Sequence, residues 1–311
     1  MCTCIRIKGI YTYFGRNMDI THSFNERVII TPRNYFIKFK KNKEIKTHYS
    51  IIGIGTIIDN YPLYAEAINE YGLAIAGLNF PMNAKYYEDK ENKVNLAPYE
   101  LILYLLSNFK TINEVKEILQ DINIINLDFS TDIKLTPLHF MVSDINKSIV
   151  IETTDEGMKV YDNPLDVLAN NPPFNYHLEN IKNYLYLTNE DPINKINPKI
   201  NIKPYSYGQG GMGLPGDLSS SSRFIRAFFT KSFLDLSQNE IHQFFKCLDS
   251  VSMIKGLVLI DNYYEYTRYS SCYNLNEGIL YYKTYYSDHI NSINMNDYKL
   301  DSSNLIDINI I

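Results

Sequence analysis

Cysteine directly follows the initiator methionine in the opening stretch MCTCIRIKGIYTYFGRNMD. If Met1 is removed, which a small second residue favours, Cys2 carries both a thiol and a free α-amine. Such an amine has an unperturbed pKa of about 7.7 to 8.0 and a cysteine thiol one of about 8.5, so one residue would hold a nucleophile and its general base near neutral pH. The plainer alternative is an incidental small residue on an edge strand.

The residues after Cys2 predict a hairpin whose second strand brings a charged side chain close to Cys2. Apolar and polar residues alternate on both sides of Lys8-Gly9, a pair typical of a tight turn. With the turn at that pair, Cys2 lies opposite Gly15 and next to Arg16. The hairpin therefore predicts a guanidinium beside the candidate nucleophile.

Asp19 adds a carboxylate within a few residues of the same place. A guanidinium at Arg16 favours a thiolate, and the carboxylate can accept a hydrogen bond from the Cys2 amine and orient it. The alternative is an ion pair between Asp19 and an arginine that only fixes the hairpin.

Other motifs carry less chemistry. The stretch GQGGMGLPG from Gly208 lacks the Gly-Lys-Ser/Thr ending of a phosphate loop, and a flexible interface loop explains it better. The 6 His and 4 Cys show no metal-binding spacing, so we expect structural histidines and neither a metal nor a cofactor. Cys4 shares a strand face with Cys2; we expect an inert core thiol rather than an oxidation-prone one.

The composition is that of a folded protein with a small-molecule partner. The 311 residues, 45% of them hydrophobic and 21% charged, leave room for one large domain. A net charge of -5 without a basic stripe argues against nucleic-acid binding. Neither a signal peptide nor a run of about 18 apolar residues is present, so we expect a cytoplasmic protein with free thiols and no membrane partner.

Short strand patterns and paired helical patterns alternate along the chain. Apolar and β-branched runs predict strands at 50–59, 72–80, 138–144, 147–154, 256–261 and 278–286. Helical periodicity predicts helices at 98–109, 111–122, 223–236 and 241–248, with capping signals at Thr111/Glu114, Ser219–Ser222 and Ser237/Glu240. Because the helices come in two pairs between strands, an α+β layered domain with two mainly antiparallel sheets fits best.

Two further segments stand apart from these elements. Residues 189–213 are rich in Pro, Asn and Gly and too long for a simple connection, which predicts an interface arm or a lid. The polar tail after Asn291, with its scattered Ile, packs as a last strand or frays.

Five blocks occur in the order shown by choloylglycine hydrolases: MCT, FGRNMD, AGLNFP, NNPPF and LPGDLSSSSRFIR. From Met1 to about Asn296 the chain resembles this family, which includes bile salt hydrolases and penicillin V acylases. The resemblance implies an N-terminal-nucleophile amidase with a four-layer αββα sandwich, a single domain over 1–311, no cofactor, and a homotetramer in which the arm at 189–213 reaches a neighbour.

The resemblance also implies a role for each matched residue. Cys2 is the nucleophile, with Arg16 and Asp19 beside it in FGRNMD. Asn79 in AGLNFP and Asn170 in LANNPPF are the donors that stabilise the oxyanion, and Arg223 of SSRF completes the polar set. We assign this role to Asn170 rather than to Asn171, because Asn170 stands four residues before Phe174 in its block.

Taken alone, three of these residues have plainer explanations. Asn79 and Asn170 suit turns, which is the favoured explanation from the residues alone. Arg223 can be a surface residue, although an arginine in the first turn of a helix opposes the helix dipole and indicates a specific partner.

The substrate follows from one matched position. Penicillin V acylases typically carry tyrosine where this chain has Asn79, so the resemblance favours a bile acid conjugated to glycine or taurine, whose carbonyl becomes a thioester on Cys2. Candidates for the steroid pocket are the apolar residues Met18, Ile20, Phe24, Phe80 and Phe140. The alternatives are a penicillin V acylase or acyl-homoserine lactone acylase, a glutamine amidotransferase, and a steroid- or lipid-binding protein whose cysteine stays masked by Met1.

Overall fold

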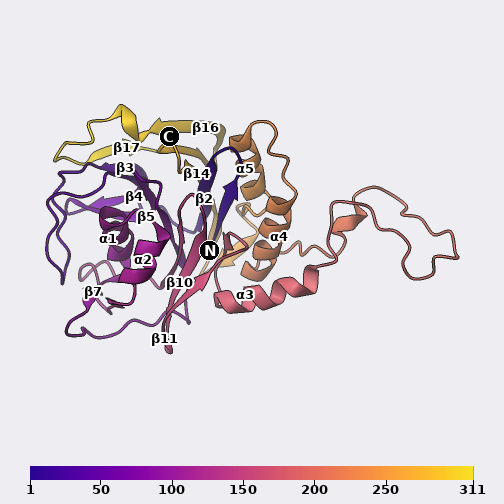
Figure 1. Cartoon of the computed structure of the whole chain (residues 1–311), viewed down its shortest axis with the longest axis horizontal. Helices are drawn as coiled ribbons and strands as arrows, with labels where there is room; N and C mark the ends of the chain where they lie inside the picture. The colour runs from indigo at the N-terminus through magenta and orange to yellow at the C-terminus, as the bar shows by residue number, and fades with distance from the viewer. Residues whose placement is uncertain (311) are drawn as a thin grey trace.

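Two large antiparallel sheets lie face to face between helices in the structure, a computed structural model that describes residues 1–310 (Figure 1). The first sheet runs in the order β12 (Val167–Leu168), β1 (Cys2–Lys8), β2 (Thr12–Ile20), β14 (Tyr263–Asn274), β15 (Ile279–Thr284) and β16 (Ser287–Asn294), and β13 (Val258–Ile260) pairs with β14. The second runs in the order β11 (Gly157–Asp162), β10 (Ser148–Thr154), β9 (Leu138–Ser143), β6 (Ala74–Asn79), β5 (Tyr61–Asn69), β4 (Ile51–Ile58), β3 (Arg27–Thr31) and β17 (Ile306–Asn309). A separate parallel pair joins β7 (Val94–Leu96) to β8 (Ile122–Ile124).

Helices cover the outer faces of both sheets. The second sheet carries α1 (Leu101–Asn108) and α2 (Ile112–Ile118), whereas α4 (Ser220–Ser232) and α5 (Glu240–Asp249) pack on the first sheet, with α3 (Phe174–Asn180) nearby (Figure 1). Short 3₁₀ turns complete the elements at Pro98–Glu100, Ile181–Tyr184, Gln209–Gly211 and Met295–Asp297. One apolar core lies between the sheets and under α4 and α5, and a second lies between the second sheet and α1. This arrangement confirms the predicted four-layer αββα sandwich.

Local side-chain bonds explain where three helices begin. Thr111 and Glu114 form the predicted capping box of α2. The hydroxyl of Ser219 accepts from the Ser222 N–H, so α4 begins within the serine run, earlier than its predicted start at 223. For α5 the prediction of a Ser237 cap was wrong, because the side chain of Asn239 accepts from the His242 N–H instead.

The opening hairpin forms, but its predicted register was wrong. The observed turn is longer, since the Gly9 N–H donates to the carbonyl of Tyr11 and the Glu240 carboxylate accepts from the Ile10 N–H at 2.6 Å. Cys2 therefore pairs with Met18 rather than with Gly15.

The observed register decides which side chains share a face with Cys2. Arg16 pairs with Cys4, one diagonal step from Cys2, so its side chain lies on the same face as the thiol. Thr3 and Asn17 pair with each other and lie on the opposite face, towards the helices, where the Asn17 amide donates to the carbonyl of Leu248 on α5.

Residues 189–213 leave the body of the protein as a long irregular excursion (Figure 1). Its large apolar side chains are exposed, including Ile193, Ile196, Tyr205 and Tyr207.

The tail after Asn291 packs as a last strand and does not fray at that point, because β17 pairs with β3. None of the helices within residues 1–310 has the length and apolar character needed to cross a membrane.

Candidate active site

Cys2 begins β1 and places its sulfur between the two sheets. The residue is 3% exposed and lines a cavity of about 680 Å³. Its sulfur contacts Nη2 of Arg16, whose Nη1 donates to the carbonyl of Gly77 on the second sheet at 2.6 Å. The guanidinium thus bridges the sheets and is held against the sulfur.

The Glu66 carboxyl group lies next to the Arg16 guanidinium, on the second sheet. Glu66 Oε2 lies 3.6 Å from Arg16 Nη1 and accepts from the Tyr269 hydroxyl at 3.1 Å. Burial raises the pKa of Glu66 to about 7, against the opposing effects of Arg16 and Tyr269. Burial disfavours the Arg16 charge, yet the charges of Cys2 and Glu66 outweigh it and raise the pKa of Arg16. The sulfur therefore faces a permanent cation, the surroundings that favour a thiolate.

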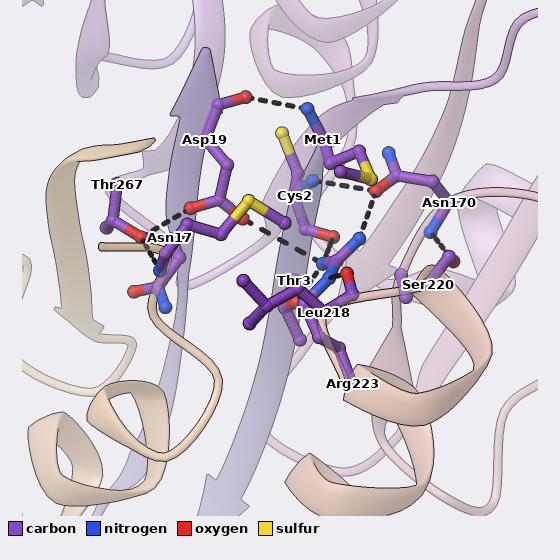
Figure 2. A network of polar contacts seen from close by, with 12 residues as sticks. Met1, Cys2, Thr3, Asn17, Asp19, Asn170, Leu218, Ser220, Arg223 and Thr267 are labelled. Atoms are coloured by element: carbon purple, nitrogen blue, oxygen red, sulfur yellow. Dashed lines mark hydrogen bonds and ion pairs between the residues drawn. The ribbon is translucent and has the colours of Figure 1, made fainter. Parts of the chain in front are cut away.

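The main chain of Cys2 faces the opposite way, towards α4 (Figure 2). Nη1 of Arg223 donates to the Cys2 carbonyl at 2.6 Å and to the Thr3 hydroxyl at 2.5 Å. Nη2 of the same guanidinium donates to Oδ1 of Asn170 at 2.9 Å, and that oxygen also accepts from the Cys2 nitrogen at 2.7 Å. Arg223 and Asn170 therefore fix the backbone of the candidate nucleophile.

Buried groups hold Asn170 in this orientation. Its N–H donates to the Ser220 hydroxyl at 2.7 Å, and its amide nitrogen donates to the carbonyl of Asn79 at 2.7 Å. Nε2 of His177 lies 3.3 Å from the Asn170 carbonyl, and burial lowers the pKa of His177 to about 4, so a neutral ring can donate there. Asn170 thus offers its oxygen, not its amide nitrogen, to Cys2.

Asn79 presents a different kind of group to the cavity. It lines the cavity together with Cys2, and no hydrogen-bond partner for its side-chain amide is found among residues 1–310. Its N–H groups are consequently free to meet a ligand oxygen.

Asp19 is buried on β2 beside the chain start. Its Oδ1 accepts from the Thr267 hydroxyl at 2.6 Å, while Oδ2 lies 3.8 Å from Arg223 without any hydrogen-bond donor. Burial raises the pKa of Asp19, against the opposing charge of Arg223. The terminal nitrogen of the full chain is that of Met1, and it donates to the main-chain carbonyl of Asp19 at 2.8 Å. The bond from the Cys2 amine to the Asp19 carboxylate stays a prediction. The free Oδ2 remains as an acceptor near the Cys2 main chain.

The cavity is largely apolar, and three of the five predicted pocket residues line it: Met18, Ile20 and Phe24. Phe80 and Phe140 do not. Phe80 is fully buried and stacked on His139, with ring centroids 4.3 Å apart, and Phe140 belongs to the core under α1. Both aromatic side chains are core residues.

Several cavity residues escaped the sequence analysis. The walls come from the β4–β5 hairpin, from α1 with the turn before it, and from the loop ahead of β9: Thr56, Ile58, Leu63, Tyr99, Ile102, Phe129, Ile133, Leu135, Thr136 and Leu138. Loop residues have no periodicity that marks them as pocket walls. Glu66 and Glu265 could have been found, because each is the lone carboxylate of its strand.

The other cysteines and the possible metal ligands show no sign of a chemical role in the structure. Burial raises the pKa of Cys4 well above its ordinary value, which keeps it a core thiol. All four cysteines are free, and within residues 1–310 no group of three or more His, Cys, Asp or Glu is arranged to hold a metal ion.

Comparison with known proteins shows which families share this sequence and this architecture. The chain matches the sequence profile of the linear amide C-N hydrolases, choloylglycine hydrolase family, over residues 2–308. A relative from Lactiplantibacillus plantarum named bile salt hydrolase/transferase is 48% identical, over 98% of this chain and 96% of the relative. A mutant conjugated bile acid hydrolase from Clostridium perfringens has a solved structure with a TM-score of 0.94 at 38% identity, covering 100% of this chain and 97% of that one. Penicillin V acylase from Agrobacterium tumefaciens shares the fold, with a TM-score of 0.78 at 19% identity over 99% of this chain and 91% of that one.

The fold is therefore that of the N-terminal-nucleophile hydrolases, as predicted. The chain belongs to the choloylglycine hydrolase family, and it is a hydrolase of linear amide C–N bonds.

Proposed function

We propose that this enzyme hydrolyses the amide bond between a bile acid and glycine or taurine. The observation that carries the proposal is the cysteine sulfur held against Arg16 at the wall of an apolar cavity of about 680 Å³. That volume lies in the range of roughly 300–1,000 Å³ typical of small-molecule sites. The relative that is 48% identical over nearly the whole chain bears a bile salt hydrolase name.

The reaction begins when removal of Met1 frees the Cys2 amine. The amine takes the thiol proton, and the sulfur, stabilised by Arg16, attacks the amide carbonyl of the substrate. Negative charge then develops on the carbonyl oxygen, which the free N–H groups of Asn79 stabilise; one such donor contributes about 3 kcal/mol.

Collapse of this intermediate breaks the C–N bond and leaves a thioester on Cys2. The protonated amine gives its proton to the departing nitrogen, and then activates a water that hydrolyses the thioester. Asn170 keeps an acceptor at the amine, and Arg223 holds the Cys2 carbonyl at 2.6 Å through both steps. Asp19 Oδ2, which has no donor, accepts a second hydrogen bond from the freed amine.

Met18, Ile20 and Phe24 bind the apolar steroid in this proposal, together with the cavity walls from the β4–β5 hairpin and the loop before β9. The polar end of the substrate then lies at Cys2, where the charged and amide groups gather. The division between apolar walls and a polar end matches the shape of a conjugated bile acid.

Purified protein tests the proposal through kcat/KM for glycocholate, taurocholate and penicillin V. We expect both bile acid conjugates to be cleaved faster than penicillin V, and Cys2→Ala to abolish turnover while the thermal unfolding temperature is kept. Faster cleavage of penicillin V would favour the acylase alternative. Wild-type activity in Cys2→Ala would remove the thioester from the mechanism.

We infer further that the chain forms one domain and acts as a homotetramer in the cytoplasm. The arm at 189–213 exposes Ile196 and Tyr207 almost completely, at 97% and 95%, which favours a neighbouring subunit as their cover. The four free cysteines fit a reducing compartment.

A further inference from the structure

His139 and Glu152 form a buried polar pair that the mechanism above does not use. His139 lies on β9 and Glu152 on β10, and both side chains are 0% exposed. Nδ1 of the ring lies 2.9 Å from Glu152 Oε1. Neither residue lines the cavity at Cys2. Polar groups are costly to bury unless all of them are hydrogen-bonded, so the remaining partners of this pair show what it holds in place.

One of those partners belongs to the segment that carries Asn170. Residues 169–173 connect β12 to α3 and form neither helix nor strand, so no regular ladder of backbone hydrogen bonds fixes them. Nε2 of His139 lies 2.9 Å from the carbonyl of Ala169, directly before Asn170. A carbonyl oxygen only accepts, so Nε2 carries a proton and donates it to this bond.

Glu152 holds the other end of the same segment. Both of its oxygens accept from the N–H of Phe174, at 3.0 Å and 3.2 Å, where α3 begins. One proton lies between Oε1 and the ring nitrogen of His139, which links the two contacts. The pair therefore holds the main chain on both sides of Asn170.

The ring of His139 is held in turn by Phe80. The two rings stack with their centroids 4.3 Å apart and their planes 5° from parallel. Phe80 directly follows Asn79, whose carbonyl accepts from the Asn170 amide at 2.7 Å. The stacked ring has little freedom to turn, so Nε2 keeps its direction towards the Ala169 carbonyl.

We propose that the His139–Glu152 pair positions Asn170 for the reaction. The inference rests on the proposed amide hydrolysis, in which Asn170 Oδ1 accepts from the Cys2 amine. That oxygen lies 2.7 Å from the Cys2 nitrogen and also accepts from Arg223 at 2.9 Å. A shift of the segment separates this acceptor from the amine that moves the proton, and a displacement of about 1 Å can slow a reaction by about 100-fold.

Replacement of either member of the pair tests the proposal in the processed enzyme. We measure kcat and KM for glycocholate per active site, and alkylation of Cys2 counts the active sites. Glu152→Leu and His139→Leu should each lower kcat by about 10- to 100-fold and change KM by less than about threefold, because Asn170 acts on the reacting amine. Glu152→Gln should keep most of the activity, since its amide can still donate to the ring and accept from the Phe174 N–H.

A milder pair of variants keeps the test decisive where leucine at these positions prevents folding. The amide nitrogen of His139→Gln reaches the position of Nε2, whereas that of His139→Asn reaches only the position of Nδ1. His139→Asn should therefore lose more kcat than His139→Gln, because only the longer side chain keeps the contact with the Ala169 carbonyl.

A double-mutant cycle separates action through Asn170 from general damage. Asn170→Ala removes the acceptor itself, so adding Glu152→Leu should lower kcat further by less than about threefold. A purely structural role of Glu152 would instead multiply the two losses. Cholate that accumulates over long incubations is quantified by mass spectrometry, so that slow variants are measured as well.

His48→Leu is the matched control. His48 is also buried, and its ring nitrogens lie 2.7 Å and 2.9 Å from the carbonyls of Tyr49 and Tyr35, none of which lines the cavity. The substitution should lower the thermal unfolding temperature as His139→Leu does, while kcat per active site stays at the wild-type value.

The outcomes distinguish this inference from the proposed function. Wild-type kcat per active site in the leucine variants, multiplied losses in the cycle, equal losses in Glu152→Gln and Glu152→Leu, or a matching loss in His48→Leu would each overturn the positioning role. A wild type that cleaves penicillin V but not glycocholate would overturn the proposed function instead. The same comparisons would then be made with penicillin V, because the reaction still uses Cys2 and Asn170.

Discussion

Arg16 reaches the sulfur of Cys2 from a strand position opposite Cys4. The contact is diagonal across the β1–β2 pair, and the same guanidinium continues to the Gly77 carbonyl and the Glu66 carboxylate on the other sheet. One side chain therefore links the candidate nucleophile to both layers of the sandwich.

Replacement of Arg16 by Leu should slow alkylation of Cys2 by iodoacetamide about tenfold at neutral pH, because a charge-assisted contact to sulfur is lost. It should also lower the free energy of unfolding by about 1 to 3 kcal/mol, since the buried Glu66 carboxyl loses its partner. Adding Glu66→Gln should restore most of the stability but not the alkylation rate. Recovery of the alkylation rate in the double variant would contradict the role of Arg16 at the sulfur.

Glu66 should make stability depend on pH. Its pKa is raised from 4.5 to about 7 by burial, so the folded protein keeps a proton that the unfolded chain releases over this window. Stability from this group is therefore present below pH 4.5 and lost as the pH rises towards 7, by up to about 3 kcal/mol. Urea unfolding at several pH values should show this loss in the wild type relative to Glu66→Gln. Parallel curves for the two proteins would contradict it.

Asn79→Ala should reduce kcat for glycocholate by about 100- to 1,000-fold with a smaller change in KM, because its free amide acts on charge that develops only in the transition state. Asn83→Ala provides the matched control, since its amide contacts the Pro81 carbonyl outside the cavity. An Asn79→Ala variant with raised KM and unaltered kcat would assign this residue to substrate binding instead.

The active protein should lack Met1. With Met1 present, the Cys2 nitrogen is a peptide nitrogen and cannot take the thiol proton, and Met1 lies in the cavity wall. Intact-mass spectrometry of the fractions with the highest specific activity should give the mass of the chain without one methionine. Full activity in protein that keeps Met1 would end the proton path through the Cys2 amine.

The arm at 189–213 should set the oligomeric state. Ile196→Asp with Tyr207→Asp should lower the molecular mass in sedimentation velocity by disrupting an apolar contact between subunits. Asp substitutions at the exposed Lys199 and Lys203 in the same arm control for added negative charge. A monomeric wild type would exclude the tetramer.

Much of the layering could be predicted from the sequence, but not the hairpin register. Ile10 continues the apolar alternation and therefore looked like a strand residue, yet it lies in the turn and is 85% exposed. The contact that fixes this turn comes from Glu240, which is 230 residues away. A register error of an odd number of residues exchanges the two faces of a strand. With Cys2 opposite Gly15, the neighbouring Arg16 would point to the other face, so the expected contact with the thiol arises only in the observed register.

Phe80 and Phe140 show a second limit of the sequence. Alternation indicates that a strand residue points inward, but a four-layer sandwich has several buried layers, and the pattern does not say which one receives the side chain. The blocks FGRNMD and SSRF could be matched as motifs. The lone carboxylate of Glu66 could be noticed in its strand, but its role follows only from Arg16, which lies on the other sheet.

The cavity walls and the polar groups at Cys2 come from different parts of the chain. Strands β1 and β2, Asn170 and Arg223 hold the reacting end, while the β4–β5 hairpin and the loop before β9 supply most of the walls. Substitutions in those two loops can therefore reshape what the enzyme accepts and leave its bond-breaking apparatus intact. Because of this separation, the range of amide substrates can change during evolution through substitutions in these loops alone.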